Sequence, residues 1–188
     1  MRRALFAFVL LCAQASYAQE DVGLVNLVAG DPVYQAGSAK AYMRVREGDR
    51  FDLPAGARLG VIYFSGGRQE RWQGPARFTA GKQQSVALAG KPVEVTTLPS
   101  SVPQRLARIP DLTRGALFGG VAVRGSKPVE RAETDDSLLE ARATYAKMRR
   151  ELPADDLTPE LFLYAALSAG PNPDSDEVKA LAARLRDR

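Results

Sequence analysis

The spacing of turn residues in the first half of the chain constrains its fold more than any other feature. Gly, Pro, Asp and Ser recur about every eight to twelve residues, and the segments between them alternate apolar with polar residues or carry short β-branched and aromatic runs. Such short segments are typical of strands. We therefore predict an all-β domain over residues 19–98, folded as a short-stranded sandwich or a β-solenoid. The expected strands are Gly23–Val28, Pro32–Gln35, Lys40–Arg46, Asp49–Leu53, Arg58–Phe64, Arg68–Gln73, Ala76–Ala80, Ser85–Leu88 and Pro92–Leu98.

In the last third of the chain the hydrophobic period changes from two residues to 3.6. Ser137 and Glu140 form a capping box at the start of one helix, and Thr158 is placed to cap a second. Apolar residues surround the axis of this second helix, so we expect it to be the buried middle element. A third helix opens near Asp174. Residues 134–188 are thus predicted to form a module of about three helices, loosely similar to tetratricopeptide helix pairs but without their repeat of about 34 residues.

The segment between these two regions, residues 99–133, is interpreted as a linker. Its Pro- and Ser-rich start is followed by a short helix over Gln104–Ala107, with Ser100 or Ser101 as its cap. Residues 116–125 have the composition of one more strand, which could return to complete the β domain.

The first 18 residues have the three parts of a secretory signal peptide. Arg2 and Arg3 supply positive charge, Ala4–Ala13 is a short apolar segment, and small residues lead up to a cleavage site after Ala18. The apolar segment is shorter than the roughly 20 residues that a membrane-spanning helix needs, and no later segment is apolar enough. We therefore assign residues 1–18 as a signal peptide and expect a periplasmic mature protein with no transmembrane segment.

A motif in the β region resembles a known family. The run from Val45 to Gly67, VREGDRFDLPAGARLGVIYFSGG, followed by WQGPA from Trp72, is similar to the central part of a FecR-like domain, although Ser65 stands where the hairpin usually carries Asp or Asn. The resemblance covers about residues 22–98. It implies a periplasmic β-sandwich or short β-solenoid that binds proteins or envelope ligands. The best-known members regulate a sigma factor through a cytoplasmic N-terminal segment, which the predicted signal peptide replaces here.

Six residues of the motif region are assigned to turns. Glycine suits bends between consecutive strands, and an aspartate carboxylate can accept backbone N–H groups exposed at a bend. A cation site is not expected, because two acids three residues apart among arginines supply too few ligands and an opposing charge. The assigned turn residues are Gly48, Asp49, Gly56, Gly66, Gly67 and Gly74.

Charge is distributed unevenly along the chain. Residues 40–91 contain ten Lys and Arg against four Asp and Glu, whereas residues 130–188 contain nine against thirteen. The basic residues either occupy the solvent face of the strands or attract a polyanion such as peptidoglycan carboxylates. The one tryptophan is either a core residue or an exposed contact for a sugar ring or a partner. The candidate binding residues are Tyr42, Arg44, Arg46, Arg68, Arg71 and Trp72.

The residue types present leave little chemistry for catalysis. Histidine is absent, and the one cysteine, Cys12, lies in the predicted signal peptide. This excludes Ser-His-Asp and Cys-His triads, histidine zinc sites and a disulfide framework in the mature chain. The paired acids Asp135–Asp136 and Asp155–Asp156 precede predicted helices, where carboxylates cap the helix and favour its positive end. We therefore expect no catalytic residue, no metal and no cofactor.

These features predict a non-enzymatic binding or adaptor protein that mediates protein–protein interaction in an envelope or signalling assembly. The expected partners are other periplasmic or envelope proteins, and two oppositely charged regions could engage different ones. The alternative is a glycan-binding or peptidoglycan-binding module of the cell envelope. A hydrolase is a third hypothesis, which turnover abolished by neutralising a β-domain acid would support. Nucleic acid is not expected as a partner, because the periplasm offers little of it.

Overall fold

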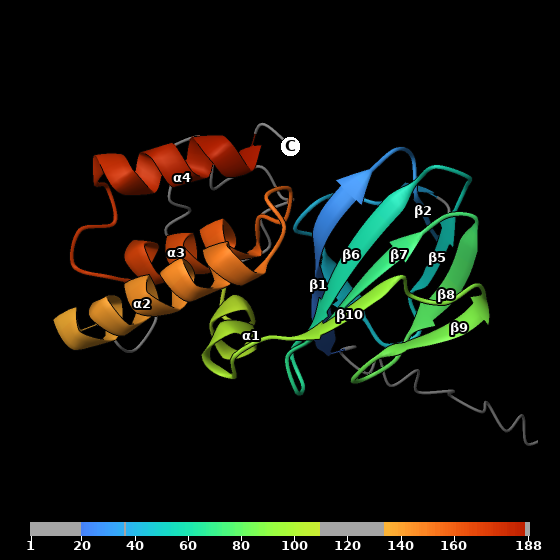
Figure 1. Cartoon of the computed structure of the whole chain (residues 1–188), viewed down its shortest axis with the longest axis horizontal. Helices are drawn as coiled ribbons and strands as arrows, with labels where there is room; N and C mark the ends of the chain where they lie inside the picture. Colours follow the sequence, from blue (N-terminus) through green and yellow to red (C-terminus); the bar gives the residue numbers. More distant parts are fainter. Residues whose placement is uncertain (1–19, 36, 110–133, 187–188) are drawn as a thin grey trace, which may run out of the picture.

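The computed structural model describes residues 20–35, 37–109 and 134–186. Within these residues, ten strands form two antiparallel five-stranded sheets, and four helices follow them. The sheets lie face to face, and the helices are gathered on one side of the sandwich (Figure 1). The prediction of a β region followed by about three C-terminal helices is confirmed. The proposed signal peptide and the strand predicted at 116–125 lie outside the described residues.

The sheet nearer the helices, which we call the helix-side sheet, has the strand order β10-β7-β6-β1-β4. The other sheet, the outer sheet, has the order β3-β2-β5-β8-β9. The helix-side strands are β1 (Asp21–Ala29), β4 (Arg44–Arg46), β6 (Arg58–Tyr63), β7 (Arg68–Gln73) and β10 (Glu94–Thr97). The outer strands are β2 (Val33–Tyr34), β3 (Gly37–Ser38), β5 (Arg50–Leu53), β8 (Ala76–Ala80) and β9 (Ser85–Ala89).

One expected strand is much shorter than predicted. Only Arg44–Arg46 of the segment 40–46 is a strand, because the chain turns at Ala41 and Tyr42, where Tyr42 has a φ of 64°. The residues assigned to turns lie between strands: Gly48, Gly56, Gly66 and Gly67 have positive φ, Asp49 accepts the backbone N–H of Arg46 at 2.7 Å, and Gly74 precedes a cis proline. At Gly74 a Cβ atom would collide with the carbonyl oxygen of Pro54, so only glycine fits.

The space between the two sheets is filled by an aromatic core. The Trp72 and Phe78 rings stack with centroids 4.3 Å apart, and Phe78 stacks on Phe51 at 5.0 Å. Val61 and Tyr63 of β6 complete this core from the helix-side sheet. Large aromatic side chains bury the most apolar area per residue, so this stack contributes strongly to holding the sheets together.

A second apolar core lies between the helix-side sheet and the helices. Leu24 of β1 and Ile62 of β6 pack in one cluster with Leu106, Met148 and Leu161 from three helices. Strands β1 and β6 are therefore buried on both faces, which explains why their sequences are nearly continuous apolar runs. The helices are α1 (Ser101–Leu106), α2 (Asp135–Glu151), α3 (Thr158–Ser168) and α4 (Asp176–Arg186).

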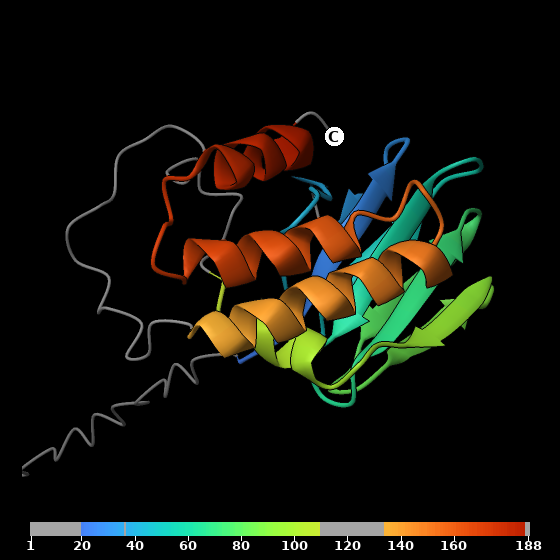
Figure 2. The same ribbon diagram turned by 60° about the vertical axis from the view of Figure 1, so that its left-hand side comes forward.

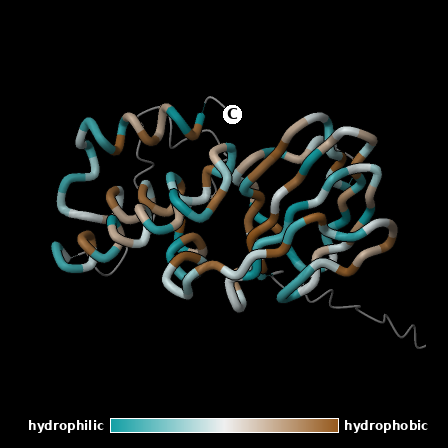
Figure 3. Tube along the Cα trace, in the orientation of Figure 1, coloured by the Kyte–Doolittle hydropathy of each residue, from teal (hydrophilic) through white to brown (hydrophobic). Residues whose placement is uncertain are grey.

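Helix α3 is the centre of the helical layer. It contacts α1, α2 and α4, and every residue from Thr158 to Leu167 is buried, as predicted from its apolar circumference. Figure 2 shows α2 and α3 side by side. In Figure 3, hydrophobic stretches run through the centre of the sandwich, whereas the α3–α4 connection is hydrophilic. The segment interpreted as the start of a linker contributes α1 to this layer, because Val102 and Leu106 are fully buried in the shared core.

Three helix caps differ from the prediction. Ser100 stands at the N-cap of α1, but its side chain makes no capping hydrogen bond, and Ser101 is already the first residue of the helix. The hydroxyl of Thr134, rather than that of Ser137, caps α2 by accepting the Ser137 N–H at 3.3 Å. Thr158 is the first residue of α3 instead of its cap, and its N–H donates to Asp156 Oδ1 at 2.9 Å.

Among the described residues no helix is both long and apolar enough to cross a bilayer.

Candidate interaction surface

The structure does not bring the six predicted binding residues to one surface. Trp72 is only 1% exposed and faces the sandwich core, and Tyr42 is 5% exposed and packs in the core shared with the helices. The Trp72 indole N–H donates to the buried carboxylate of Glu70 at 3.2 Å. Of the two interpretations of Trp72, the core one is correct, and its use as an exposed sugar or partner contact is wrong. Tyr42 is likewise wrong as an exposed contact.

The four arginines are used mainly within the chain. Arg44 donates to the backbone carbonyls of Ala107 and Ile109 after α1, and its guanidinium lies 5.2 Å from the centroid of the Phe64 ring. Arg68 donates to Glu70 at 2.5 Å. Arg46 is half-exposed and pairs with Asp21, and Arg71 faces the helices. The alternation of these strands suggested a solvent face, but the helical layer covers much of it.

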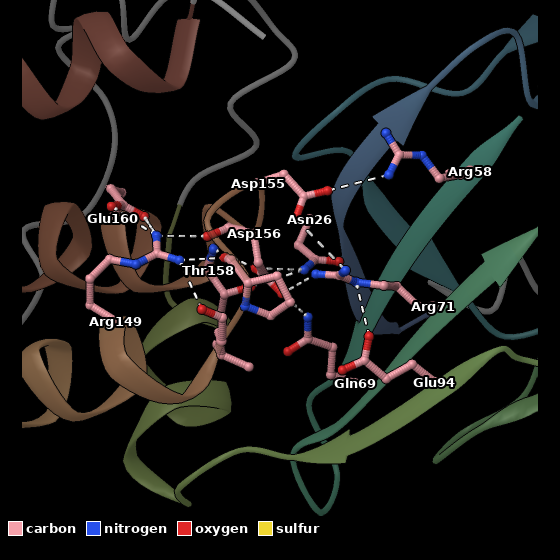
Figure 4. A network of polar contacts seen from close by, with 12 residues as sticks. Asn26, Arg58, Gln69, Arg71, Glu94, Arg149, Asp155, Asp156, Thr158 and Glu160 are labelled. Carbon is pink, nitrogen blue, oxygen red and sulfur yellow. Dashed lines mark hydrogen bonds and ion pairs between the residues drawn. The ribbon is translucent and has the colours of Figure 1, made fainter.

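A buried polar network joins the sheet to the helices around Asp156, and we call it the Asp156 network (Figure 4). Asp156 lies in the loop before α3 and is fully buried. Its carboxylate accepts from Gln69 Nε2 at 2.5 Å, from Arg71 at 3.1 Å and from Asn26 Nδ2 at 3.3 Å. Asn26 also donates to the Thr158 hydroxyl at 2.9 Å. Residues from β1, β7 and the α2–α3 loop are thereby held in one arrangement.

A β-bulge places Asn26 in this network. The pairing of β1 with β6 shifts between Val25 and Leu27, so one extra residue stands in β1. Asn26 is therefore turned toward the helices, while Val25 still packs in the sandwich core. Gly60 on the neighbouring strand makes this possible, because a Cβ there would collide with Asn26 Oδ1 and lie 2.9 Å from Leu27 Cβ. The bulge was not visible in the sequence, where β1 appears as a regular apolar strand.

Further ion pairs fix the loop before α3. Glu160 in the first turn of α3 is fully buried, and its carboxylate is paired with Arg149 at 2.9 Å and Arg184 at 3.4 Å. Arg149 also donates to the backbone carbonyl of Asp156 at 3.0 Å. Asp155 pairs with Arg58 at 3.4 Å across the same junction. The charged groups at this junction are therefore matched by opposite charges within the chain.

This arrangement changes the interpretation of the uneven charge. Arg58 and Arg71 belong to the basic region and meet Asp155 and Asp156 of the acidic region. The opposite charges therefore attract the two parts of the chain to one another, and the hypothesis that each region recruits a different partner loses its basis.

A pocket of about 60 Å³ beside the junction, between Asn26 and Asp155, has room for only a few water molecules. In the described residues, no group of three or more His, Cys, Asp or Glu is placed to hold a metal ion.

The most unusual surface lies on the opposite side of the sandwich from β4. Among the described strands, β10 and β9 each stand at the end of their sheet, and they follow one another in the chain (Figure 1). Four large apolar side chains are exposed there, and we call them the β9–β10 edge: Val86 (57%), Leu88 (58%), Val93 (62%) and Val95 (44%). Natural proteins usually shorten, charge or cover such edges. An exposed apolar edge is therefore a candidate surface for binding.

The inner side of β9 is fastened to the other sheet. The Ser85 N–H donates to the Glu70 carboxylate at 3.3 Å, and the Ser85 hydroxyl lies 2.8 Å from the Tyr63 hydroxyl. Burial raises the pKa of Tyr63 above its usual range, so this phenol stays protonated at neutral pH. The start of β9 is thus held in place, while the four residues that follow are exposed. A fixed backbone with exposed apolar side chains is prepared for a ligand at little cost in ordering.

The prediction from sequence identified β9 and β10 as strands but not as a binding surface. The run from Val86 to Ala89 is apolar, uncharged and flanked by Lys82 and Lys91, which is the available signal for an edge strand. The strand order of both sheets was needed to recognise that this apolar run lies on an edge strand.

Comparison with protein-family models, curated proteins and solved structures found no match.

Proposed function

We propose that this protein is a non-enzymatic, FecR-like binding protein of the periplasm that acts as an adaptor by docking another envelope protein on the β9–β10 edge. The observation that carries this proposal is the exposure of Val86 and Leu88 on β9, Val95 on β10 and Val93 in the connection between these two edge strands. The signal-peptide pattern of residues 1–18 supports export, and the motif at 45–67 supports the family resemblance.

The size of the apolar edge suits a reversible interaction. Full burial of a Val or Leu side chain contributes about 1.5–3 kcal/mol, so covering four half-exposed ones contributes about 3–6 kcal/mol. Association itself costs about 4–15 kcal/mol in lost translational and rotational freedom. The edge therefore needs further contacts, such as backbone hydrogen bonds, and is expected to bind a partner with moderate affinity.

The rest of the fold supports this use of the edge. The helical layer covers the outer face of the helix-side sheet, and the Asp156 network locks the helices onto it. The helices thereby make the helix-side sheet, and with it the sandwich, more rigid. A rigid sheet keeps its edge strands in a conformation that can bind without refolding.

The glycan-binding alternative has less support. It depended on Tyr42 and Trp72 as aromatic platforms for sugar rings, and both rings are buried. Arg46, which is half-exposed, pairs with Asp21. We therefore carry the protein-docking proposal forward alone.

The test compares two charge insertions in the full chain. Leu88→Lys places a charge on the β9–β10 edge, whereas Leu139→Lys places one at a similarly exposed leucine on α2, which is 66% exposed. Both positions are exposed, so each variant should retain its stability within about 0.5 kcal/mol. Tagged versions of the parent chain and both variants are expressed in the envelope, cross-linked and purified.

The proposal predicts an envelope protein that is recovered in stoichiometric amount with the parent chain and with Leu139→Lys, and lost with Leu88→Lys. Recovery of the same protein with all three versions would refute docking on this edge. Recovery with none of them would also count against the proposal.

A further inference from the structure

We propose that β9 binds an extended segment of its partner by antiparallel strand addition, and that this segment is apolar at alternate positions and acidic at both ends. The inference deepens the proposed function and rests on it, because it names the chemistry of what docks on the β9–β10 edge. It is carried by the pairing of β9, the exposure of its side chains and the charges at its two ends.

The backbone of β9 is paired on one side only. Its residues from Ser85 to Ala89 pair with β8, from Ala80 back to Arg77, and no other described strand pairs with it. A strand that ends a sheet presents a row of unpaired N–H and C=O groups to its surroundings. In β9 the first N–H, that of Ser85, already donates to Glu70, so the row available to a partner begins after it. An added strand would satisfy these groups, and antiparallel addition would continue the pairing direction of the outer sheet.

The side chains of β9 define the apolar part of the partner. Val86 is opposite Thr79, and Leu88 lies where the pairing with β8 shifts. Both side chains are more than half exposed, so both are available to an added strand. Cross-strand neighbours in an antiparallel pair contact one another, and β-branched residues are favoured opposite such side chains. The added segment should therefore carry valine, isoleucine or threonine at alternate positions.

The ends of the strand define the charged part. Lys82 precedes β9 by three residues and Lys91 follows it by two, and both are exposed. Lys82 has only a weak pairing with Glu47, at 3.9 Å. Glu94 is the acidic residue nearest to Lys91 in the sequence, and its carboxylate is paired with Arg71 at 3.6 Å. A segment with a carboxylate at each end would therefore place one negative charge near each lysine.

Lys82 and Lys91 also make a second copy of this chain an unfavourable occupant of the β9 edge. Antiparallel pairing of β9 with itself about its central residue, Ala87, would bring Lys82 of each copy beside Lys91 of the other. Like charges facing each other across an edge oppose the pairing, which is how lysines commonly protect edge strands from self-association. The observations thus favour a different chain as the occupant.

The probe is a synthetic, fluorescently labelled peptide of alternating valine and threonine with two glutamates at each end. A matched peptide carries lysines in place of the glutamates. Binding to the full chain is measured by fluorescence anisotropy at low and high salt. We expect the glutamate-flanked peptide to bind at least tenfold more tightly than the lysine-flanked one at low salt, and the difference to shrink at high salt as the charges are screened.

Variants of the chain provide the controls. Leu88→Lys should weaken binding of the glutamate-flanked peptide at least tenfold, and Leu139→Lys should leave it unchanged within about twofold. The double variant Lys82→Glu, Lys91→Glu should reverse the preference between the two peptides. Hydrogen exchange should show that the β9 amides on the side away from β8 are unprotected in the free chain and become protected with the peptide.

Four results would overturn the inference. They are absence of binding by the glutamate-flanked peptide, equal binding of both peptides, dimerisation of the parent chain that Leu88→Lys abolishes, and protection in the free monomer of the β9 amides on the side away from β8. The first two would leave the docking proposal standing if Leu88→Lys still loses the envelope protein in the cross-linking test. Failure of that test as well would remove both.

Discussion

The strongest prediction about stability concerns Asp156, which joins the helices to the helix-side sheet. Asp156→Ala removes the acceptor of four hydrogen bonds. Asn26 keeps the Thr158 hydroxyl as a partner, and Arg71 keeps Glu94 and Asp155 at 3.6 and 3.8 Å. The amide of Gln69 and the N–H of Thr158 lose the acceptor that holds them. Two stranded donors cost about 1–3 kcal/mol each, and a buried ion pair is broken, so we expect a loss of about 3–5 kcal/mol.

The assay is equilibrium urea unfolding followed by circular dichroism. With a slope of about 2 kcal/mol per molar urea, the midpoint should fall by roughly 2 M. Asp155→Ala is the matched control, because its ion pairs at 3.4 and 3.8 Å are partly exposed and should contribute no more than about 1 kcal/mol. Equal effects of the two substitutions, or a loss below about 1 kcal/mol for Asp156→Ala, would show that the buried Asp156 carboxylate does not hold the helices on the sheet.

Three further predictions test other parts of the structure. Gly60→Ala should cost about 1–3 kcal/mol in urea unfolding, since the added methyl collides with Asn26, and an unchanged midpoint would contradict the close packing of the bulge. Hydrogen bonding to Arg142 lowers the pKa of Glu177 below its usual 4.5, so this carboxylate contributes stability above that pH and loses it as the pH falls through the lower folded-state value. The pair is exposed, so Glu177→Gln should cost less than about 1 kcal/mol near neutral pH and nothing in strong acid. Trp72 fluorescence should be blue-shifted and resist acrylamide quenching until the chain unfolds, whereas quenching as in a free peptide would show that the ring is not in the core.

Local patterns in the sequence predicted most of the secondary structure. Strand β8 matches its predicted bounds, and β7 does as well, because alternation and flanking turn residues mark both ends. Helix α3 was recognised as the buried middle element from its apolar circumference. These features depend on neighbours within a few residues, which a sequence displays directly.

Features that depend on distant pairing were not predictable in the same way. In the Asp156 network, Asp156 bonds to sheet residues that are 85–130 positions away in the chain, and it looked like an ordinary helix cap. Tyr42 and Trp72 looked suitable for binding because nothing local shows which face of a strand a helix will cover. The β9–β10 edge needed the order of strands in both sheets before its exposure could be recognised. The sequence thus predicted the elements well and the candidate site poorly.

Docking of another envelope protein on the β9–β10 edge can be tested by photo-cross-linking in living cells. A photoreactive side chain replaces Leu88 in one version of the full chain and Leu139 in another. We expect one discrete cross-linked product with a second envelope protein from position 88 only. In isolated envelopes, the glutamate-flanked peptide should reduce this product. A product from position 139 alone, the same product from both positions, or cross-linking of position 88 only to a second copy of this chain would contradict it.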